Sequence, residues 1–196
     1  MPLGVEELLL AAVHVQALLL ERGWRFCFIG GVAIQRWGNP RFTTDIDLTL
    51  LTGFGAEESF VDPLLRQLQP RRPDAREFAL RHRVLLARTA EGIDVDVALG
   101  ALPFEERTIA RATPWEIRGG VRLTTCSAED LLTHKVFAGR SVDWGDAEQI
   151  LVRQHGKLNL AQVLAELGPL LELKGQPEAM ARLDELIAQV SRRSTA

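Results

Sequence analysis

The pattern of apolar and polar residues divides the chain into a mixed first part and a helical last part. Residues 24–29 are typical of a short buried strand, whereas residues 44–51 and 93–99 alternate polar with apolar side chains, the period of a half-buried strand. Beyond residue 126 only the helical period remains. We therefore expect an α+β fold, with a small mixed sheet and flanking helices over residues 1–126 and a helical section over residues 127–196.

Glycine and proline positions set the boundaries between the expected elements. Gly23 suits the end of the first helix, and Gly92 lies in the turn of a hairpin. Gly30 and Gly31 separate a strand from a helix. Helices are expected at residues 5–23, 32–37, 57–68, 104–112, 127–139, 144–154, 160–173 and 177–192, and strands at 24–29, 44–51, 84–89, 93–99 and, as a short pair, 115–125.

Composition and charge exclude several classes of protein. The 196 residues are 46% hydrophobic and 25% charged, as in ordinary globular proteins, which excludes a disordered or collagen-like chain. A formal net charge of −3 argues against a protein that coats nucleic acid non-specifically. Cys27 and Cys126 are expected to be buried, reduced thiols. Residues 5–20 carry too many polar side chains for a signal peptide or membrane span, so a cytoplasmic location without membrane contact is expected.

Two of the expected strands carry paired aspartates. Asp45 and Asp47 are two residues apart and point to one face of a strand, as do Asp94 and Asp96. A polar strand face in water is the simpler interpretation of each pair alone. If the two strands are neighbours, however, up to four carboxylates gather on one face, and such a cluster is costly without a cation. Carboxylate oxygens are ligands of Mg²⁺, so the two pairs indicate a metal site.

The Gly30-Gly31 pair lies where the strand passes into the helix. Glycine allows close approach of the backbone, and the N–H groups at a helix N-terminus attract anions. Neither GxxxxGK[ST] nor GxGxxG is present, so the turn belongs to neither of those phosphate-binding motifs.

These motifs together resemble a known group of proteins. The segment FIGG at 28–31, followed after thirteen residues by DIDL at 45–48, resembles the signature of the DNA polymerase β-like nucleotidyltransferase superfamily. The segments RFTTD at 41–45 and EDLLTHKVFAGRSVDWGD at 129–146 resemble its AbiEii-like bacterial branch, which includes toxins of toxin–antitoxin pairs. The resemblance covers about residues 24–151.

The resemblance implies an Mg²⁺-dependent nucleotidyltransferase with a sheet of that type. Such an enzyme moves an NMP from an NTP such as ATP to a hydroxyl group of RNA, protein or a small molecule. Asp45, Asp47 and a third aspartate would hold two Mg²⁺ ions as catalytic residues. The sequence leaves open whether the third is Asp94 or Asp96, and we prefer Asp96 because the residues that follow it match the family.

Contacts with the nucleotide are also implied by the resemblance. Val32 stands where relatives often place a hydroxyl residue, so any grip on the phosphates must come from the backbone there. Asp143 and Asp146 are interpreted instead as a helix N-terminal pair that the helix dipole favours. The residues assigned to nucleotide binding are Gly30, Gly31, Arg41, Thr43 and Lys135.

The sequence also suggests partners other than the nucleotide. Residues 66–88 contain seven arginines against only Asp74 and Glu77, which suits an RNA acceptor or, alternatively, a solvated segment whose arginines pair with nearby acids. The AbiEii-like segments imply an antitoxin-type protein partner. A non-catalytic interaction module with the same fold is the alternative hypothesis, motivated by Val32 and by the lack of a long acceptor-binding domain.

Overall fold

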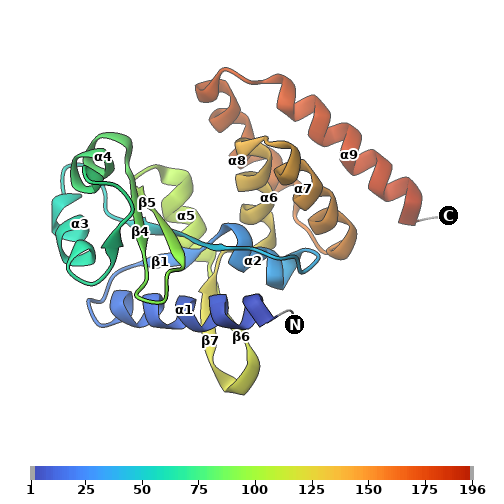
Figure 1. Cartoon of the computed structure of the whole chain (residues 1–196). Coiled ribbons are helices and arrows are strands. Elements are labelled where there is room, and N and C mark those ends of the chain that lie inside the picture. Colours follow the sequence, from blue (N-terminus) through green and yellow to red (C-terminus); the bar gives the residue numbers. More distant parts are fainter. Residues whose placement is uncertain (1–2, 195–196) are drawn as a thin grey trace. The chain divides into compact units, whose positions relative to one another are not determined.

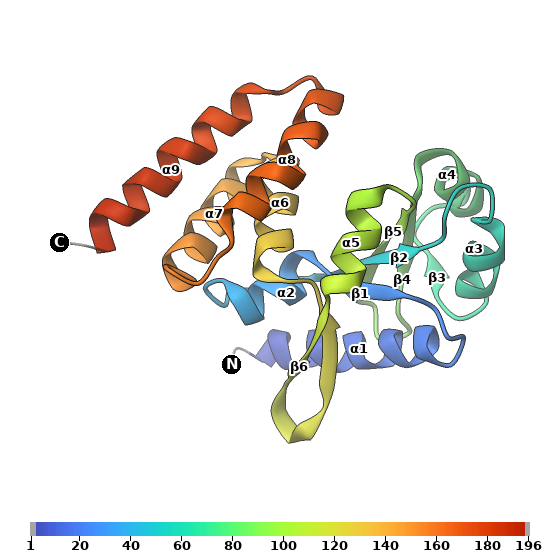
Figure 2. The same ribbon diagram turned by 180° about the vertical axis from the view of Figure 1, so that it is seen from behind.

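The computed structural model describes residues 3–194, which Figures 1 and 2 show from opposite sides. These residues form two compact units. The first comprises residues 3–32 and 42–126 and contains the β-sheet, and the second comprises residues 33–41 and 127–194 and is helical. Helix α2 (Gly30–Trp37) begins in the first unit and continues into the second.

The strands of the first unit form one mixed sheet. They are β1 (Phe26–Phe28), β2 (Asp45–Leu51), β3 (Gln69–Pro70), β4 (Val84–Arg88), β5 (Asp94–Gly100), β6 (Thr113–Glu116) and β7 (Arg122–Thr125), in the spatial order β3-β4-β5-β2-β1-β7-β6. Strand β2 runs parallel to β5 and antiparallel to β1. The mixed sheet confirms the α+β prediction, and the two aspartate-bearing strands are neighbours.

The hydrophobic core lies on one face of this sheet. Ile46 and Leu48 of β2 and Val95 of β5 are fully buried and belong to one cluster with apolar residues of α1 (Leu3–Leu20), α3 (Glu58–Leu65) and α4 (Ala75–His82). Helix α1 supplies buried side chains three or four residues apart, the spacing of an amphipathic helix. Because side chains alternate along a strand, the aspartates of β2 and β5 project from the opposite face.

Helix α5 (Pro103–Arg111) starts directly after β5 and packs on β2 and β1, where Figure 2 shows it in front of the sheet. The Glu105 carboxylate accepts hydrogen bonds from the main-chain N–H groups of Ala101 and Leu102, both at 2.8 Å, and so fixes the first turn. The helix therefore begins at the C-terminal end of β5, which is the end remote from Asp94.

The second unit contains α6 (Ala128–Ala138), α7 (Ser141–Arg153), α8 (Leu160–Lys174) and α9 (Glu178–Ser194). Two of these helices have N-caps: Ser127 Oγ accepts from Asp130 N at 3.1 Å, and Asn159 Oδ1 accepts from Gln162 N at 3.2 Å. Between residues 3 and 194, every helix is too short or too polar to cross a bilayer.

One strand, β3, and one α-helix, α4, were not predicted from the sequence. Strand β3 has only two residues, one of them Pro70, and helix α4 buries only Ala75 and Ala79 on its apolar side, so neither has a strong periodicity. Helix α2 begins at Gly30 rather than at residue 32, and α7 begins at Ser141 rather than at residue 144. Cys27 and Cys126 are buried and form no disulfide, as expected.

Candidate active site

The parallel register of β2 and β5 places four carboxylates side by side. Asp45 lies opposite Asp94, and Asp47 lies opposite Asp96. Neighbouring strands are about 4.8 Å apart, so each residue lies next to its partner on the same face. All four aspartates are half-buried, whereas Ile46 between Asp45 and Asp47 is fully buried. We call these four residues the carboxylate row.

The turn from β1 into α2 lies against this row. Ile29 N donates to Asp47 O at 3.0 Å. Gly30 has a φ of +53°, and a Cβ added to it would lie 2.6 Å from Asp47 Cγ. A Cβ on Gly31 would lie 2.9 Å from Thr43 Cβ. Both contacts are too short for any larger residue, so the backbone at the start of α2 directly adjoins Asp47 and Thr43.

Thr43 is also tied to the row through its side chain. Its Oγ1 donates a hydrogen bond to Asp45 Oδ1 at 2.9 Å, and the residue is only 6% exposed. The bond fixes the orientation of the Asp45 carboxylate. The structure therefore brings together six of the predicted site residues in the first unit: Gly30, Gly31, Thr43, Asp45, Asp47 and Asp96.

Two arginines that sequence reasoning missed are paired with the row. Arg71 Nε lies 3.2 Å from Asp94 Oδ2, and Arg71 Nη1 forms a hydrogen-bonded ion pair with Asp96 Oδ1. Arg88 Nε donates to Asp94 Oδ1 at 2.6 Å. Arg88 lies directly opposite Asp94 in the β4–β5 pair. Arg71 and Arg88 compensate half of the formal negative charge of the row.

The electrostatic environment of Asp96 differs from that of an ordinary surface carboxylate. Burial raises the pKa of Asp96, the attraction of Arg71 opposes this rise, and the carboxylates of Asp45 and Asp94 add to it. The charged form of Asp96 is therefore disfavoured by its surroundings, as expected where like charges are gathered.

The donor set of the row fits Mg²⁺ in its chemistry, because four carboxylates lie on one face of the sheet, beside the Gly-Gly turn. Between residues 3 and 194, however, no three carboxylate, imidazole or thiolate groups converge around one point as metal ligands do. Arg71 and Arg88 hold the Asp94 and Asp96 carboxylates in ion pairs instead.

The other two predicted nucleotide contacts, Arg41 and Lys135, belong to the second unit and form a charge network there. Arg41 donates to both carboxylate oxygens of Asp146, through Nε and Nη2, each at 2.8 Å. Lys135 Nζ lies 2.9 Å from Asp146 Oδ2 and 3.2 Å from Asp143 Oδ1, and Arg140 Nε donates to Asp143 Oδ2 at 2.6 Å. We call these five residues the α6–α7 charge network.

Three of the five residues of this network are deeply buried. Asp143 is 0% exposed, Asp146 6% and Lys135 5%. Burial alone raises the pKa of each acid, but hydrogen bonds from Arg140 to Asp143 and from Arg41 to Asp146, with the attraction of Lys135, hold both pKa values below the usual range. Asp143 also accepts from Arg140 N at 3.3 Å and lies in the first turn of α7, as predicted. Asp146, predicted to be the second member of this N-terminal pair, lies beyond the first turn and pairs with Arg41 and Lys135 instead.

Most of the arginine-rich segment is engaged in ion pairs. Five of its seven arginines contact acids of the first unit, which favours the interpretation as a segment neutralised by nearby acids. RNA binding through residues 66–88 stays a prediction. The pairs are Arg71 with Asp94 and Asp96, Arg72 with Asp74, Arg76 with Glu58 and Asp62, Arg83 with Glu57, and Arg88 with Asp94.

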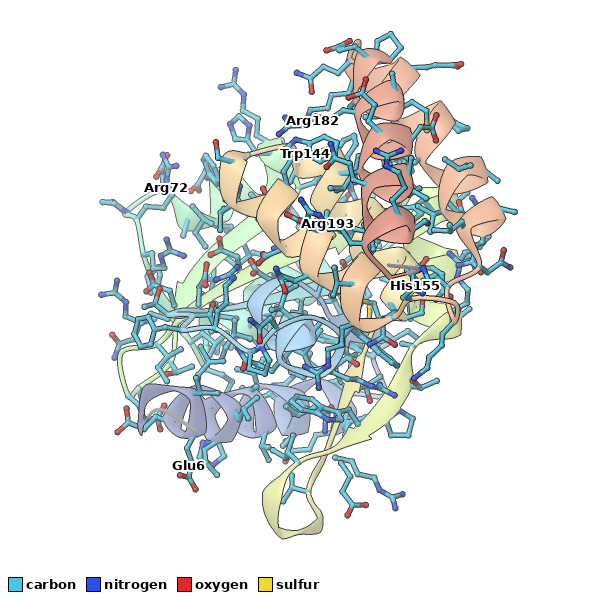
Figure 3. The ribbon with its side chains drawn as sticks, turned by 90° about the vertical axis from the view of Figure 1, so that its right-hand side faces the viewer. Glu6, Arg72, Trp144, His155, Arg182 and Arg193 are labelled. Carbon is cyan, nitrogen blue, oxygen red and sulfur yellow. The ribbon has the colours of Figure 1, made fainter. Side chains whose placement is uncertain are left out.

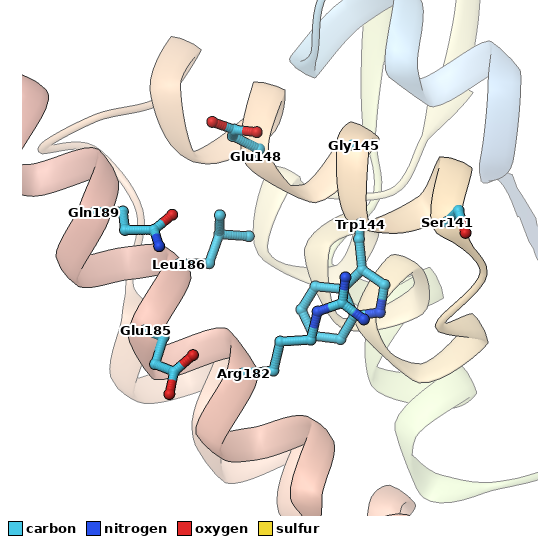
Figure 4. A pocket seen from close by; sticks show the side chains of 8 residues that line it. All are labelled: Ser141, Trp144, Gly145, Glu148, Arg182, Glu185, Leu186 and Gln189. Atoms are coloured by element: carbon cyan, nitrogen blue, oxygen red, sulfur yellow. The ribbon is translucent and has the colours of Figure 1, made fainter.

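A hollow of about 360 Å³ lies between α7 and α9 of the second unit, as Figure 4 shows. The Arg182 guanidinium lies over the Trp144 ring, 4.1 Å from its centroid. Figure 4 also shows Arg182 reaching from α9 across to the Trp144 indole of α7. None of the predicted site residues lines this hollow, and the stacked pair joins the two helices.

Two solved structures share this arrangement of sheet and helices. The crystal structure of an antigenic nucleotidyltransferase-like protein from Paracoccidioides brasiliensis has a TM-score of 0.55 at 17% identity, over 94% of this chain and 95% of that chain. The solution structure of the antibiotic-resistance factor ANT(2'')-Ia has a TM-score of 0.52 at 16% identity, over 91% of this chain and 97% of that chain. The chain therefore has a nucleotidyltransferase fold.

The particular family follows from the sequence match. A family model described as "Nucleotidyl transferase AbiEii toxin, Type IV TA system" matches residues 19–168, and the chain belongs to this family. The resemblance drawn from FIGG at 28–31 and DIDL at 45–48 is thus confirmed. A search of curated proteins found no match.

Proposed function

We propose that the chain is an Mg²⁺-dependent nucleotidyltransferase that moves an NMP from an NTP to a hydroxyl acceptor. The observation that carries the proposal is the register of β2 and β5, which gathers the carboxylate row beside the Gly30-Gly31 turn. This arrangement supplies oxygen ligands for a cation and backbone N–H groups for an anion within one compact unit. It contains no serine or cysteine nucleophile, which suits direct transfer.

Within this proposal Asp45, Asp47 and Asp96 hold two Mg²⁺ ions. Bound Mg²⁺ polarises the α-phosphate and lowers the pKa of the attacking hydroxyl. Thr43 orients Asp45 through its hydrogen bond. Asp96 suits the third ligand better than Asp94, because Arg88 and Arg71 already occupy both carboxylate oxygens of Asp94.

The remaining chain groups bind and orient the nucleotide. The free N–H groups at the start of α2 and the positive end of its helix dipole attract an anion. We therefore assign the outer phosphates to Gly30 and Gly31. Arg41 and Lys135 are kept as proposed partners of the triphosphate. Since both are paired with Asp146, Lys135 also serves to hold Asp146 and, through it, the Arg41 guanidinium.

Nucleotide binding tests the proposal. Isothermal titration of the full chain with each of the four NTPs, with and without Mg²⁺, is expected to show binding that requires the metal. Asp47→Asn removes one negative ligand without changing its size, and we expect it to weaken Mg²⁺-dependent binding at least about 100-fold. Asp184→Asn, an exposed aspartate on α9, is the matched control.

Binding that is absent from the folded wild type, or equal in wild type and Asp47→Asn, would contradict the proposal. It would favour the non-catalytic interaction module with the same fold. Transfer of label from an α-³²P-labelled NTP to total RNA, to protein or to small molecules then identifies the acceptor class.

The family match favours a second statement, that the chain is the toxin of a two-component pair. We propose that its nucleotidyl transfer is toxic until an antitoxin-type protein counteracts it. Expression of the wild-type chain alone is expected to arrest bacterial growth, and Asp47→Asn is expected to restore it. Normal growth with active, folded wild-type protein would contradict the toxin role and leave the transferase proposal intact.

A further inference from the structure

Arg71 is fixed at the edge of the sheet, beside the carboxylate row. It follows β3 directly, and its main-chain N–H donates to Leu86 O at 3.1 Å. Leu86 of β4 is the register neighbour of Asp96, so this bond sets the Arg71 backbone one strand away from that carboxylate. The Arg71 side chain is 26% exposed and that of Asp96 is 32% exposed, so water screens their ion pair only in part.

The two carboxylates of β5 depend on Arg71 to different degrees. Asp94 is paired with Arg88 through Oδ1 and with Arg71 through Oδ2. Within residues 3–194, Asp96 has an ion pair with one cation, Arg71. If Arg71 withdraws its Nη1 group from Asp96, its Nε contact with Asp94 is able to remain. Asp94 therefore serves as an anchor for Arg71, and Asp96 as the carboxylate that Arg71 is able to release.

We propose that Arg71 competes with the divalent ion for Asp96: it pairs with Asp96 in the absence of the metal and gives that carboxylate up when the metal binds, while Asp94 keeps the guanidinium beside the site. This inference rests on the proposed function, because it assigns the metal to Asp45, Asp47 and Asp96. It makes Arg71 a positioning residue that sets how much metal the site needs.

The negative charge of the carboxylate row determines how a change at Arg71 affects metal affinity. Four carboxylates gain a nearby positive charge from Arg71, which lowers their attraction for a second cation. Removal of the Arg71 charge therefore strengthens metal binding for two reasons. Asp96 loses the cation that competes with the metal, and the electrostatic potential at the carboxylate row becomes more negative.

The first test is metal binding by the full chain without nucleotide. Titration of wild type and Arg71→Gln with Mg²⁺ and with Mn²⁺ is expected to give a dissociation constant about tenfold lower for the variant, the size typical of one partly buried charge pair. Arg72→Gln is the matched control. Arg72 is the next residue along, pairs with Asp74 and lies over the Phe78 ring, and Figure 3 shows its side chain pointing outward.

A second readout uses the wild-type protein alone, so it does not depend on how the variant folds. In ¹⁵N spectra of arginine side chains, Mg²⁺ is expected to shift the Arg71 Nε–H resonance and to leave that of Arg72 in place. Metal binding without any shift at Arg71 would overturn the inference, and so would a dissociation constant for folded Arg71→Gln equal to or higher than that of wild type.

These outcomes separate the inference from the proposed function. Wild-type metal binding that Asp47→Asn abolishes, together with equal affinities of wild type and Arg71→Gln, removes the role of Arg71 and keeps the transferase. Wild type that binds neither Mg²⁺ nor Mn²⁺, with or without an NTP, removes both. Tighter binding by Arg71→Gln and unchanged binding by Arg72→Gln supports the competition.

Discussion

At Gly30 a left-handed backbone and a close approach to Asp47 coincide. Gly30→Ala would place a Cβ against the Asp47 carboxylate and would also strain the φ of +53°, so the turn and the carboxylate must move apart. We expect a loss of about 2–4 kcal/mol in the free energy of unfolding, measured by urea denaturation, because the strain and the steric clash add. We also expect a loss of Mg²⁺-dependent NTP binding.

Gly23→Ala is the control for the backbone strain alone. Gly23 has a φ of +66°, and a Cβ added there meets nothing within 4 Å. We expect this variant to lose about 1 kcal/mol and to keep its NTP binding. Equal effects of the two substitutions would show that the contact between Gly30 and Asp47 has no energetic weight.

Asp96 gives the protein a specific dependence on pH. Its pKa in the folded protein is raised above the ordinary value of 3.8, so the folded state binds the proton more tightly than the unfolded state. The stability that this group contributes is complete below that ordinary value and is lost as the pH rises through the folded-state pKa. The free energy of unfolding of wild type relative to Asp96→Asn should therefore fall as the pH rises from about 4 towards neutrality.

Urea denaturation of both proteins across this range measures the difference. Asp143 and Asp146, whose lowered pKa values destabilise the fold at low pH, are present in both proteins and cancel in the comparison. A difference that stays constant with pH, or that rises with it, would contradict the assignment to Asp96.

On the scale of helices, α6 and α7 are joined through the α6–α7 charge network. Lys135→Met removes the cation between Asp143 and Asp146 and leaves both buried carboxylates with fewer partners. Breaking a buried ion pair from one side costs about 3 kcal/mol or more, so we expect a loss of that size in the free energy of unfolding. Chemical denaturation followed by circular dichroism measures it.

Lys157→Met is the matched control, because the Lys157 side chain is exposed beyond the end of α7. Its stability is expected to remain within about 0.5 kcal/mol of wild type. If Lys135→Met proved equally harmless, the network would add nothing to the packing of α6 against α7.

How far the elements could be predicted depended on their periodicity. The alternating strands β2 and β5 and the capped helices α6 and α8 have strong local signals, and the structure contains them. The helix α4 has charged residues around two small alanines, so its packing against the sheet, rather than its own pattern, decides its conformation.

The site residues likewise fall into those that local sequence signals predict and those that depend on distant pairing. The glycine pair and the aspartates follow from local spacing, although their roles stay a prediction. Arg88 could have been found, since the predicted hairpin about Gly92 already places it opposite Asp94. Arg71 could not, because its position depends on the two-residue strand β3 and on its pairing with β4, which have no signal in the sequence.

At the scale of the whole chain, residues 33–41 belong to the helical unit although they are flanked by the sheet unit in sequence. We expect residues 1–126 produced alone to melt at least about 5 °C lower than the full chain, or to aggregate. The reason is that the buried Ile34 and the Arg41 guanidinium lose their surroundings. Hydrogen bonds from Arg153 to Gly38 O and from Gln154 to Trp37 O, the latter at 3.0 Å, are lost as well.

Thermal melting followed by circular dichroism compares the two proteins. A fragment that melts at the temperature of the full chain would show that residues 33–41 need no partners from the helical unit. Residues 1–126 would then form an independent domain.

The same interleaving orders events during synthesis on the ribosome. Arg41 and its partner Asp146 are separated by 105 positions, and translation adds about 5–20 residues per second. The nascent chain therefore carries Ile34 and its neighbours unsheltered for at least about 5 s after they are made. In that interval the sheet unit is translated up to its last residue, 126, before the helices that follow it are made. Residues 33–41 are therefore a natural binding site for chaperones.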